Sequence, residues 1–135
     1  MSEPPSASAK TILVADDEAS MRKIIERRLL SWGYRVVVAV NGTEAVRLAK
    51  ERRPDLILLD VMMPGLNGLE VCRQMKQDAA TAPIPIVIVT AKESRTIRDE
   101  AAAAGANGFI QKPYEFSELL RHIQTALGEG PAVAV

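Results

Sequence analysis

Three carboxylates and one ammonium group follow apolar runs in this sequence, and together they could bind and transfer a phosphoryl group. Asp16 and Asp17 follow the run TILVA, Asp60 follows LILL, and Lys112 follows GFIQ. Carboxylates that lie within a few ångströms of one another raise one another's pKa unless a cation intervenes, and hard oxygen ligands suit Mg²⁺. A lysine adds a compact positive charge for a phosphoryl oxygen. These groups supply what phosphoryl transfer to a carboxylate requires, namely a nucleophile, a metal site and a positive charge where negative charge accumulates.

A hydroxyl group belongs to the same candidate set. Thr90 ends the apolar run IPIVIVT, and the small Ala91 beside it leaves room for a bound group. Each member alone has an ordinary structural explanation. The acidic pair can cap a helix and interact with its dipole, the third aspartate can end a strand, the threonine can lie within one, and the lysine can be a solvated charge. The chemical interpretation therefore depends on whether the fold brings these side chains together.

The segment between residues 11 and 127 alternates between two kinds of pattern. Short apolar or β-branched segments predict strands at 11–15, 35–40, 55–61, 84–90 and 108–111. The runs within 55–61 and 84–90 are continuously apolar, which is typical of strands buried on both faces. Helical spacing of apolar residues, or a high alanine content, predicts helices at 18–31, 94–104 and 115–127. Two capping boxes, which begin at Asn41 and Asn67, predict further helices that end near Arg53 and Lys76.

Five strand–helix units in succession predict an α/β fold with a parallel sheet and helices on both faces. In such open sheets, ligands bind beyond the carboxyl ends of the strands, where the strand order reverses. The acidic pair and Lys112 directly follow predicted strands, and Asp60 and Thr90 lie at or next to the carboxyl ends of theirs. We therefore expect them at one edge of the sheet.

Composition narrows the class of protein. The chain has 135 residues, a length that predicts one domain. Its 17 Lys+Arg balance 17 Asp+Glu, and this zero net charge argues against a nucleic-acid-binding module or a polybasic membrane anchor. No apolar run approaches the roughly 20 residues of a membrane span. A single cysteine, Cys72, cannot form an internal disulfide and favours a reducing, cytoplasmic location. Residues 1–10 and 128–135 are predicted to be a disordered leader and a flexible tail around a domain at 11–127.

The sequence resembles the receiver domain of two-component response regulators over about residues 11–127. The resemblance is carried by Asp16-Asp17, by Asp60 within LLDVMMPGLNG, by Thr90-Ala91 and by Lys112-Pro113 within FIQKP. It implies a flavodoxin-like, doubly wound fold whose five-stranded parallel sheet has the order 2-1-3-4-5. It also implies a phosphoacceptor switch that assists its own phosphorylation and dephosphorylation, and not an enzyme acting on external substrates.

The resemblance further implies a role for each site residue. Asp60 would accept a phosphoryl group from a histidine kinase or a histidine phosphotransfer protein. Mg²⁺ would be held directly by Asp17, Asp60 and the backbone carbonyl of Met62, and through water by Asp16. The other matches are Thr90 and Lys112 as contacts to the phosphoryl oxygens, Phe109 as the switch aromatic coupled to Thr90, Pro113 as a cis-proline that orients Lys112, and Pro64 and Gly68 as shapers of the loop, with Ala91 leaving room.

Phosphorylation would add about −1.5 to −2 charges to Asp60. The new oxygens would draw Thr90 and Lys112 inward, and Phe109 would follow into the vacated space. The surface formed by the fourth helix, fifth strand and fifth helix would thereby change shape for an unidentified protein target.

Several alternatives stay open. About eight residues follow Leu127, too few for an output domain, so we expect a stand-alone receiver. The alternative is a receiver fragment of a longer regulator.

An α/β phosphatase with an aspartyl nucleophile would need a second carboxylate where this sequence has Met62. A nucleotide- or flavin-binding fold would need a glycine-rich loop where it has ADDEAS. The basic face of the first helix is either a solvated surface or, by the resemblance, a docking face for a kinase; it comprises Arg22, Lys23, Arg27 and Arg28.

Overall fold

The computed structural model of the chain describes residues 9–63, 65–91 and 95–129. One parallel sheet has the order β2-β1-β3-β4-β5. Its strands are β1 (Thr11–Ala15), β2 (Arg35–Ala39), β3 (Leu56–Leu59), β4 (Ile86–Thr90) and β5 (Gly108–Gln111). The helices that alternate with them are α1 (Ala19–Ser31), α2 (Gly42–Arg52), α3 (Gly68–Gln77), α4 (Arg95–Ala103) and α5 (Phe116–Leu127). The predicted α/β fold and its strand order are confirmed.

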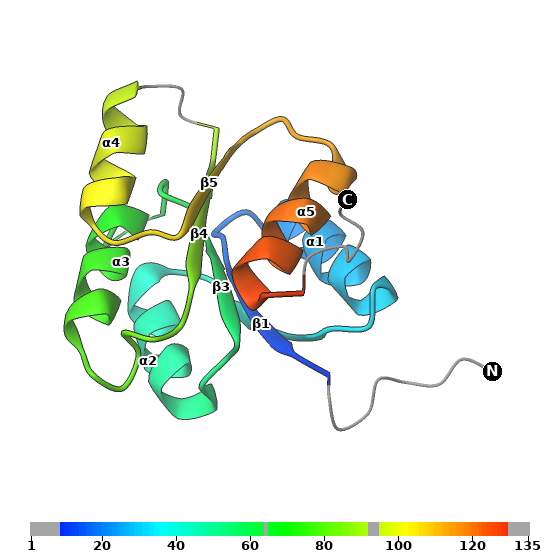
Figure 1. Cartoon of the computed structure of the whole chain (residues 1–135), viewed down its shortest axis with the longest axis horizontal. Coiled ribbons are helices and arrows are strands. Elements are labelled where there is room, and N and C mark those ends of the chain that lie inside the picture. Colours follow the sequence, from blue (N-terminus) through cyan, green and yellow to red (C-terminus); the bar gives the residue numbers. More distant parts are fainter. Residues whose placement is uncertain (1–8, 64, 92–94, 130–135) are drawn as a thin grey trace.

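Helices cover both faces of the sheet, with α1 and α5 on one face and α2, α3 and α4 on the other (Figure 1). Successive strand residues point to opposite faces, so Ile57 and Leu59 pack beneath α2, α3 and α4 while Leu56 and Leu58 pack beneath α1 and α5. All four side chains are at most 2 % exposed. The continuously apolar run therefore reflects two separate cores that share one sheet.

The predicted strand ends at Asp55, Val61 and Ile84 lie outside the observed strands. Pro85 has no N–H for the sheet, and the N–H of Ile84 instead donates to Thr81 O at 2.9 Å within the preceding turn. β4 therefore starts at Ile86. The predicted leader, tail, Pro64 and the first residue of the fourth predicted helix fall wholly or partly outside the described residues. No helix in the described ranges is long and apolar enough to span a membrane.

Two asparagines begin helices on the same face of the sheet. Asn41 Oδ1 accepts the N–H of Glu44 at 2.8 Å before α2, and Asn67 Oδ1 accepts the N–H groups of Leu69 and Glu70 at 2.9 and 3.0 Å before α3. Glu44 returns a bond to the N–H of Val40, one residue earlier than the capping residue. The predicted asparagine caps are confirmed, whereas among the described residues no bond from Glu70 completes the second capping box. The Asn67 cap fixes where α3 begins next to the loop after β3.

Candidate functional site

Backbone hydrogen bonds continue past the ends of three strands and carry the candidate residues with them. The N–H of Asp16 donates to Ala39 O at 3.2 Å, and the N–H of Asp60 donates to Ala15 O at 3.0 Å. The N–H of Lys112 donates to Thr90 O at 2.9 Å. Each candidate side chain thus leaves the backbone from a position that is held by a neighbouring strand.

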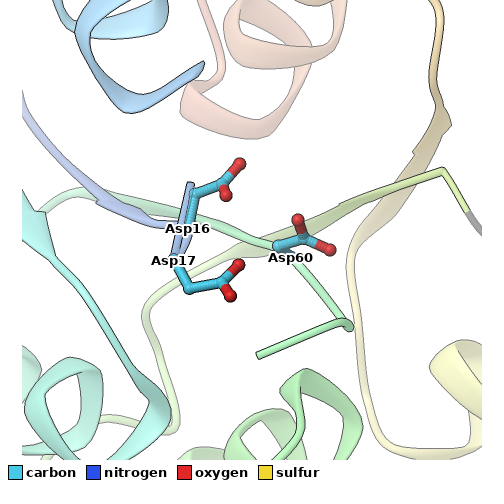
Figure 2. Close-up of side chains that lie close together, drawn as sticks. All are labelled: Asp16, Asp17 and Asp60. Carbon is cyan, nitrogen blue, oxygen red and sulfur yellow. The ribbon is translucent and has the colours of Figure 1, made fainter. Parts of the chain in front are cut away.

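The three aspartates form a cluster at the carboxyl edge of the sheet. One ligand oxygen from each of Asp16, Asp17 and Asp60 lies within 4.8 Å of the others. Figure 2 shows that the side chains of Asp16 and Asp17 extend toward the side on which Asp60 lies. Asp16 and Asp60 are buried, with 4 % and 7 % of their surface exposed, whereas Asp17 is exposed. The cluster is therefore open to solvent on one side only.

Lys112 joins two of these carboxylates. Its Nζ lies 3.3 Å from Asp16 Oδ2 and 3.2 Å from Asp60 Oδ2, and only 14 % of the lysine side chain is exposed. Burial alone would lower the pKa of Lys112, but the carboxylates of Asp60 and Asp16 outweigh it and raise the pKa. The lysine is therefore held in its charged form between β1 and β3.

Asp60 has one partner for each carboxylate oxygen. The N–H of Met62 donates to Oδ1 at 2.9 Å, and Lys112 donates to Oδ2 at 3.2 Å. Burial raises the pKa of the Asp60 carboxyl, and the Met62 N–H and the Lys112 charge offset this only in part. The negative charge of Asp60 is thus costly in this position, which favours any cation or electrophile that shares it.

The donor set fits a divalent cation with a preference for oxygen. Three carboxylates around one point supply more negative charge than the single lysine neutralises, and Mg²⁺ takes one or two carboxylates together with carbonyl or water oxygens. Met62 lies directly beside the cluster, where its N–H binds Asp60, and the residue is 53 % exposed.

The other predicted residues lie at the end of β4, on or just after β5 and at the start of α3, except Pro64, which lies outside the described ranges. Thr90 is fully buried at the end of β4, and Ala91 after it is exposed. The Lys112–Pro113 peptide bond is cis. Phe109 on β5 is half-buried, and the guanidinium carbon of Arg98 on α4 lies 4.6 Å from the centre of its ring.

Gly68 holds α3 close to the backbone of Asp60. Its N–H donates to Val61 O at 3.0 Å. A Cβ on Gly68 would overlap the Asp60 carbonyl oxygen and would lie 2.8 Å from Val61 Cα. Only glycine permits this approach, so the residue sets the distance between α3 and the strand end that carries Asp60.

Two arginines near the site were not identified from the sequence as parts of it. Arg22 was grouped with the basic face of the first helix, but its Nη1 donates to Asp16 O at 2.8 Å. Arg98 contacts Phe109 through its guanidinium. A cation in the first turn of a helix is electrostatically unfavourable. This position was the feature of the sequence that could have indicated a contact of Arg22 outside its own helix.

Comparison with known proteins gives one consistent family. The model of the response regulator receiver domain matches residues 12–124. Protein PilH of Pseudomonas aeruginosa is 37 % identical over 116 residues, which cover 86 % of this chain and 96 % of PilH. The phosphate regulon transcriptional regulatory protein PhoB of the same organism is 40 % identical over 118 residues, which cover 87 % of this chain and 52 % of PhoB.

The chain therefore spans about half the length of PhoB and of several other curated relatives. Among solved structures, the receiver domain of the sensor histidine kinase PA1611 from Pseudomonas aeruginosa matches with a TM-score of 0.83 and 33 % identity, over 90 % of this chain and 99 % of that chain. That structure has a magnesium ion coordinated in its active-site cleft.

Receiver domains are signalling switches, generally not enzymes; histidine kinases phosphorylate them, and they act on downstream targets. Neither the phosphatase nor the nucleotide-binding alternative is favoured by these matches. The strand order, the acidic cluster and the match over residues 12–124 agree, and the chain belongs to the response regulator receiver domain family.

Proposed function

We propose that Asp60 accepts a phosphoryl group from a phosphohistidine and that the resulting charge changes a protein-binding surface. The observation that carries this proposal is the position of Lys112, with Nζ 3.2 Å from Asp60 Oδ2 and 3.3 Å from Asp16 Oδ2. A fixed positive charge beside the accepting oxygen stabilises the charge that develops on the transferring group.

In the proposed step, a carboxylate oxygen of Asp60 forms a bond to phosphorus while the bond between phosphorus and the histidine nitrogen breaks. The electron pair of that bond returns to the imidazole. Lys112 is charged and contacts a phosphoryl oxygen, and Thr90, at the end of β4, donates its hydroxyl to another. The same groups would assist the later attack of water on the phosphoaspartate.

The acidic cluster would hold Mg²⁺ through Asp17, Asp60 and the backbone carbonyl of Met62, with Asp16 acting through water. When bound, the ion offsets carboxylate charge and stabilises the negative charge on the transferring oxygens. The magnesium in the cleft of the PA1611 receiver domain supports this assignment by similarity. Asp60 is well suited to share a cation, because burial raises its pKa and makes its unshared charge costly.

The proposed output is a change in the surface formed by α4, β5 and α5. The added charge on Asp60 would draw Thr90 and Lys112 toward the phosphoryl group. Phe109 would then move toward Thr90 and leave the Arg98 guanidinium, which now lies 4.6 Å from its ring centre. Movement of Phe109 and release of Arg98 would together present a different surface to a protein target.

An apolar groove next to the site supports docking of a partner helix that carries the phosphohistidine. A cavity of about 530 Å³ lies between α1 and the segment after β5, with Met21, Ile24, Pro113 and Tyr114 in its lining. Ile24 is 49 % exposed, and it also lines a separate, neighbouring cavity together with the basic side chain of Arg28. A histidine kinase or histidine phosphotransfer protein with apolar and acidic residues on one helix would fit this surface.

We also propose a cytoplasmic receiver that acts without a DNA-binding domain. The match to nearly the whole length of PilH supports the second part of this assignment. PhoB, of which the chain spans about half, supports the alternative in which this receiver forms part of a longer regulator. The mass of the protein in cell extracts, measured by immunoblotting, distinguishes the two.

The central test uses acetyl phosphate as a small phosphodonor with Mg²⁺, followed by intact-mass measurement. The wild type should gain the mass of one phosphoryl group, and Asp60→Asn should gain none. Asp99→Asn, which removes an exposed carboxylate on α4, is the matched control and should react as the wild type does. A phosphoryl group that persists in Asp60→Asn, or that forms in EDTA at the same rate, would contradict the proposal.

A further inference from the structure

Arg22 reaches back from α1 to the strand end that carries the acidic pair. Its Nη1 donates to Asp16 O at 2.8 Å, and the arginine is half-buried. This carbonyl belongs to the peptide group that joins Asp16 to Asp17. We propose that Arg22 is a positioning residue that sets the direction in which Asp17 presents its carboxylate to Mg²⁺, an inference that rests on the proposed magnesium site.

The two aspartates are held in different ways. The side chain of Asp16 has partners for both oxygens, since the N–H of Glu18 donates to Oδ1 at 2.9 Å and Lys112 donates to Oδ2 at 3.3 Å. The Asp16 N–H is also bound, to Ala39 O. Asp17 is exposed, and no described residue donates a hydrogen bond to its carboxylate. The backbone therefore sets the direction of the Asp17 Cα–Cβ bond, which is the only part of the carboxylate position that the described residues fix.

The peptide group between the two aspartates is rigid and planar, so its carbonyl direction fixes the plane from which Asp17 continues. Arg22 supplies a charged donor to that carbonyl, and hydrogen bonds from charged donors are the stronger kind. A change in this bond would rotate the peptide and move the Asp17 carboxylate relative to Asp60. Mg²⁺ is sensitive to such a shift because it requires nearly ideal octahedral geometry.

The location of Arg22 in α1 argues against a role in helix stability. It is the fourth residue of the helix, in a turn that contains no acidic residue and whose capping residue, Glu18, forms no side-chain capping bond. A positive charge there opposes the helix dipole. The bond to the acidic pair therefore explains the arginine better than the helix does.

Positioning and simple charge have opposite consequences for metal affinity. If Arg22 acted only as a nearby positive charge, its removal would strengthen Mg²⁺ binding, because a competing cation would be lost. If it positions Asp17, its removal weakens binding. Loss of groups that orient metal ligands typically weakens metal affinity roughly 10–100-fold, and we expect an effect of about tenfold for Arg22→Met.

The experiment titrates MgCl₂ alone into the full chain and follows backbone amide signals by NMR, including that of Asp17. Arg22→Met removes charge and donors, whereas Arg22→Lys keeps the charge but loses the planar fork of donors. Arg27→Met is the matched control, since Arg27 is exposed on the same helix and lies outside the acidic cluster. Urea denaturation of each variant in EDTA separates metal affinity from stability.

Weaker Mg²⁺ binding in Arg22→Met, intermediate binding in Arg22→Lys and unchanged binding in Arg27→Met would support the inference. Unchanged or tighter binding in Arg22→Met would overturn it. If Arg22→Met does not fold, weaker binding in Arg22→Lys supports the inference and wild-type binding overturns it. Failure of the proposed magnesium site itself is seen separately, as a wild type whose signals do not respond to Mg²⁺ or an Asp17→Asn variant that binds as well as the wild type.

Discussion

Replacing Gly68 with alanine measures how closely α3 is fitted against the strand end that carries Asp60. The added Cβ would overlap the Asp60 carbonyl oxygen and would lie 2.8 Å from Val61 Cα and 2.9 Å from the Asp60 carbonyl carbon. Carbon atoms in ordinary contact lie about 3.5 Å apart, so the two backbone segments must separate by roughly 0.7 Å. All three atoms belong to the backbone and cannot rotate away as a side-chain atom can.

Two effects of opposite sign determine the magnitude. Alanine is favoured over glycine within a helix by about 1 kcal/mol, but Gly68 is the first residue of α3, where only part of this gain applies. Overpacking of a fitted interior costs about 1–3 kcal/mol, and movement of backbone places this case at the upper end. We expect Gly68→Ala to lower the free energy of unfolding by about 2 kcal/mol, which corresponds to a urea midpoint about 1 M lower.

Urea denaturation followed by circular dichroism measures the stability, and the rate of phosphorylation by acetyl phosphate measures the displacement of Asp60. Misplacement of reacting groups by about 1 Å can slow a reaction roughly 10²-fold, so we expect at least about tenfold slower phosphorylation of Gly68→Ala. Gly65→Ala is the control, because a Cβ there meets nothing within 4 Å although its φ is +78°. It should lose stability through backbone strain alone and keep the wild-type rate.

If Gly68→Ala is as stable as the wild type and is phosphorylated as fast, then α3 does not approach the strand end as closely as described. A loss of stability without any change in rate would show that α3 moves while Asp60 stays in place. That second result would refute the claim that Gly68 determines the position of the phosphoacceptor.

Further predictions concern the charges and caps around the site. Burial raises the pKa of Asp60, so its ionised form destabilises the fold once the pH exceeds the roughly 4 of an unfolded aspartate. In EDTA, Asp60→Asn should therefore be more stable than the wild type at neutral pH, and the urea midpoints of the two proteins should converge as the pH falls. A stability difference that grows toward acidic pH would contradict this expectation. Lys112→Met leaves two buried carboxylates without their cation, so it should lower the free energy of unfolding by about 3 kcal/mol at neutral pH. Urea denaturation measures this loss, and a variant as stable as the wild type would contradict the expectation. Asn67→Ala should cost about 1 kcal/mol through loss of the α3 cap, whereas Asn67→Asp should retain most of the wild-type urea midpoint; equal losses in both would exclude capping as the cause.

Much of the fold could be predicted because local and long-range preferences agree. The run Leu56–Leu59 is apolar at every position, as a strand between two cores must be, and the side chains indeed divide between the two. Asn67 marks the start of α3 through a bond within its own turn, which depends little on the rest of the chain. The start of β4 was less predictable than its end at Thr90, since a proline at position 85 and a turn bond from Ile84 decide where pairing begins.

The site was predictable to the extent that its residues follow strands. Asp16, Asp60 and Lys112 come together because parallel strands end at one edge, and Lys112 pairs with both aspartates. The contacts of Arg22 and Arg98 could not be predicted in the same way. Long side chains on helix surfaces have many rotamers, and only the packed neighbours decide whether an arginine reaches solvent, a carbonyl or an aromatic ring.

The ion pairs of Lys112 with Asp16 and Asp60 affect how a cation and an anion would bind in the cleft. The ammonium group is a counterion tethered to the protein, and a tethered group competes at an effective concentration of the order of millimolar or higher. Any free cation that binds Asp16 and Asp60 must share or displace this internal one. A ligand that draws the lysine away raises the affinity of the vacated oxygens for the free cation. By thermodynamic reciprocity, the bound cation raises the affinity for that ligand by the same factor. Occupancy of the cleft by a metal and by an anion such as a phosphoryl group would thereby be coupled through the Lys112 side chain.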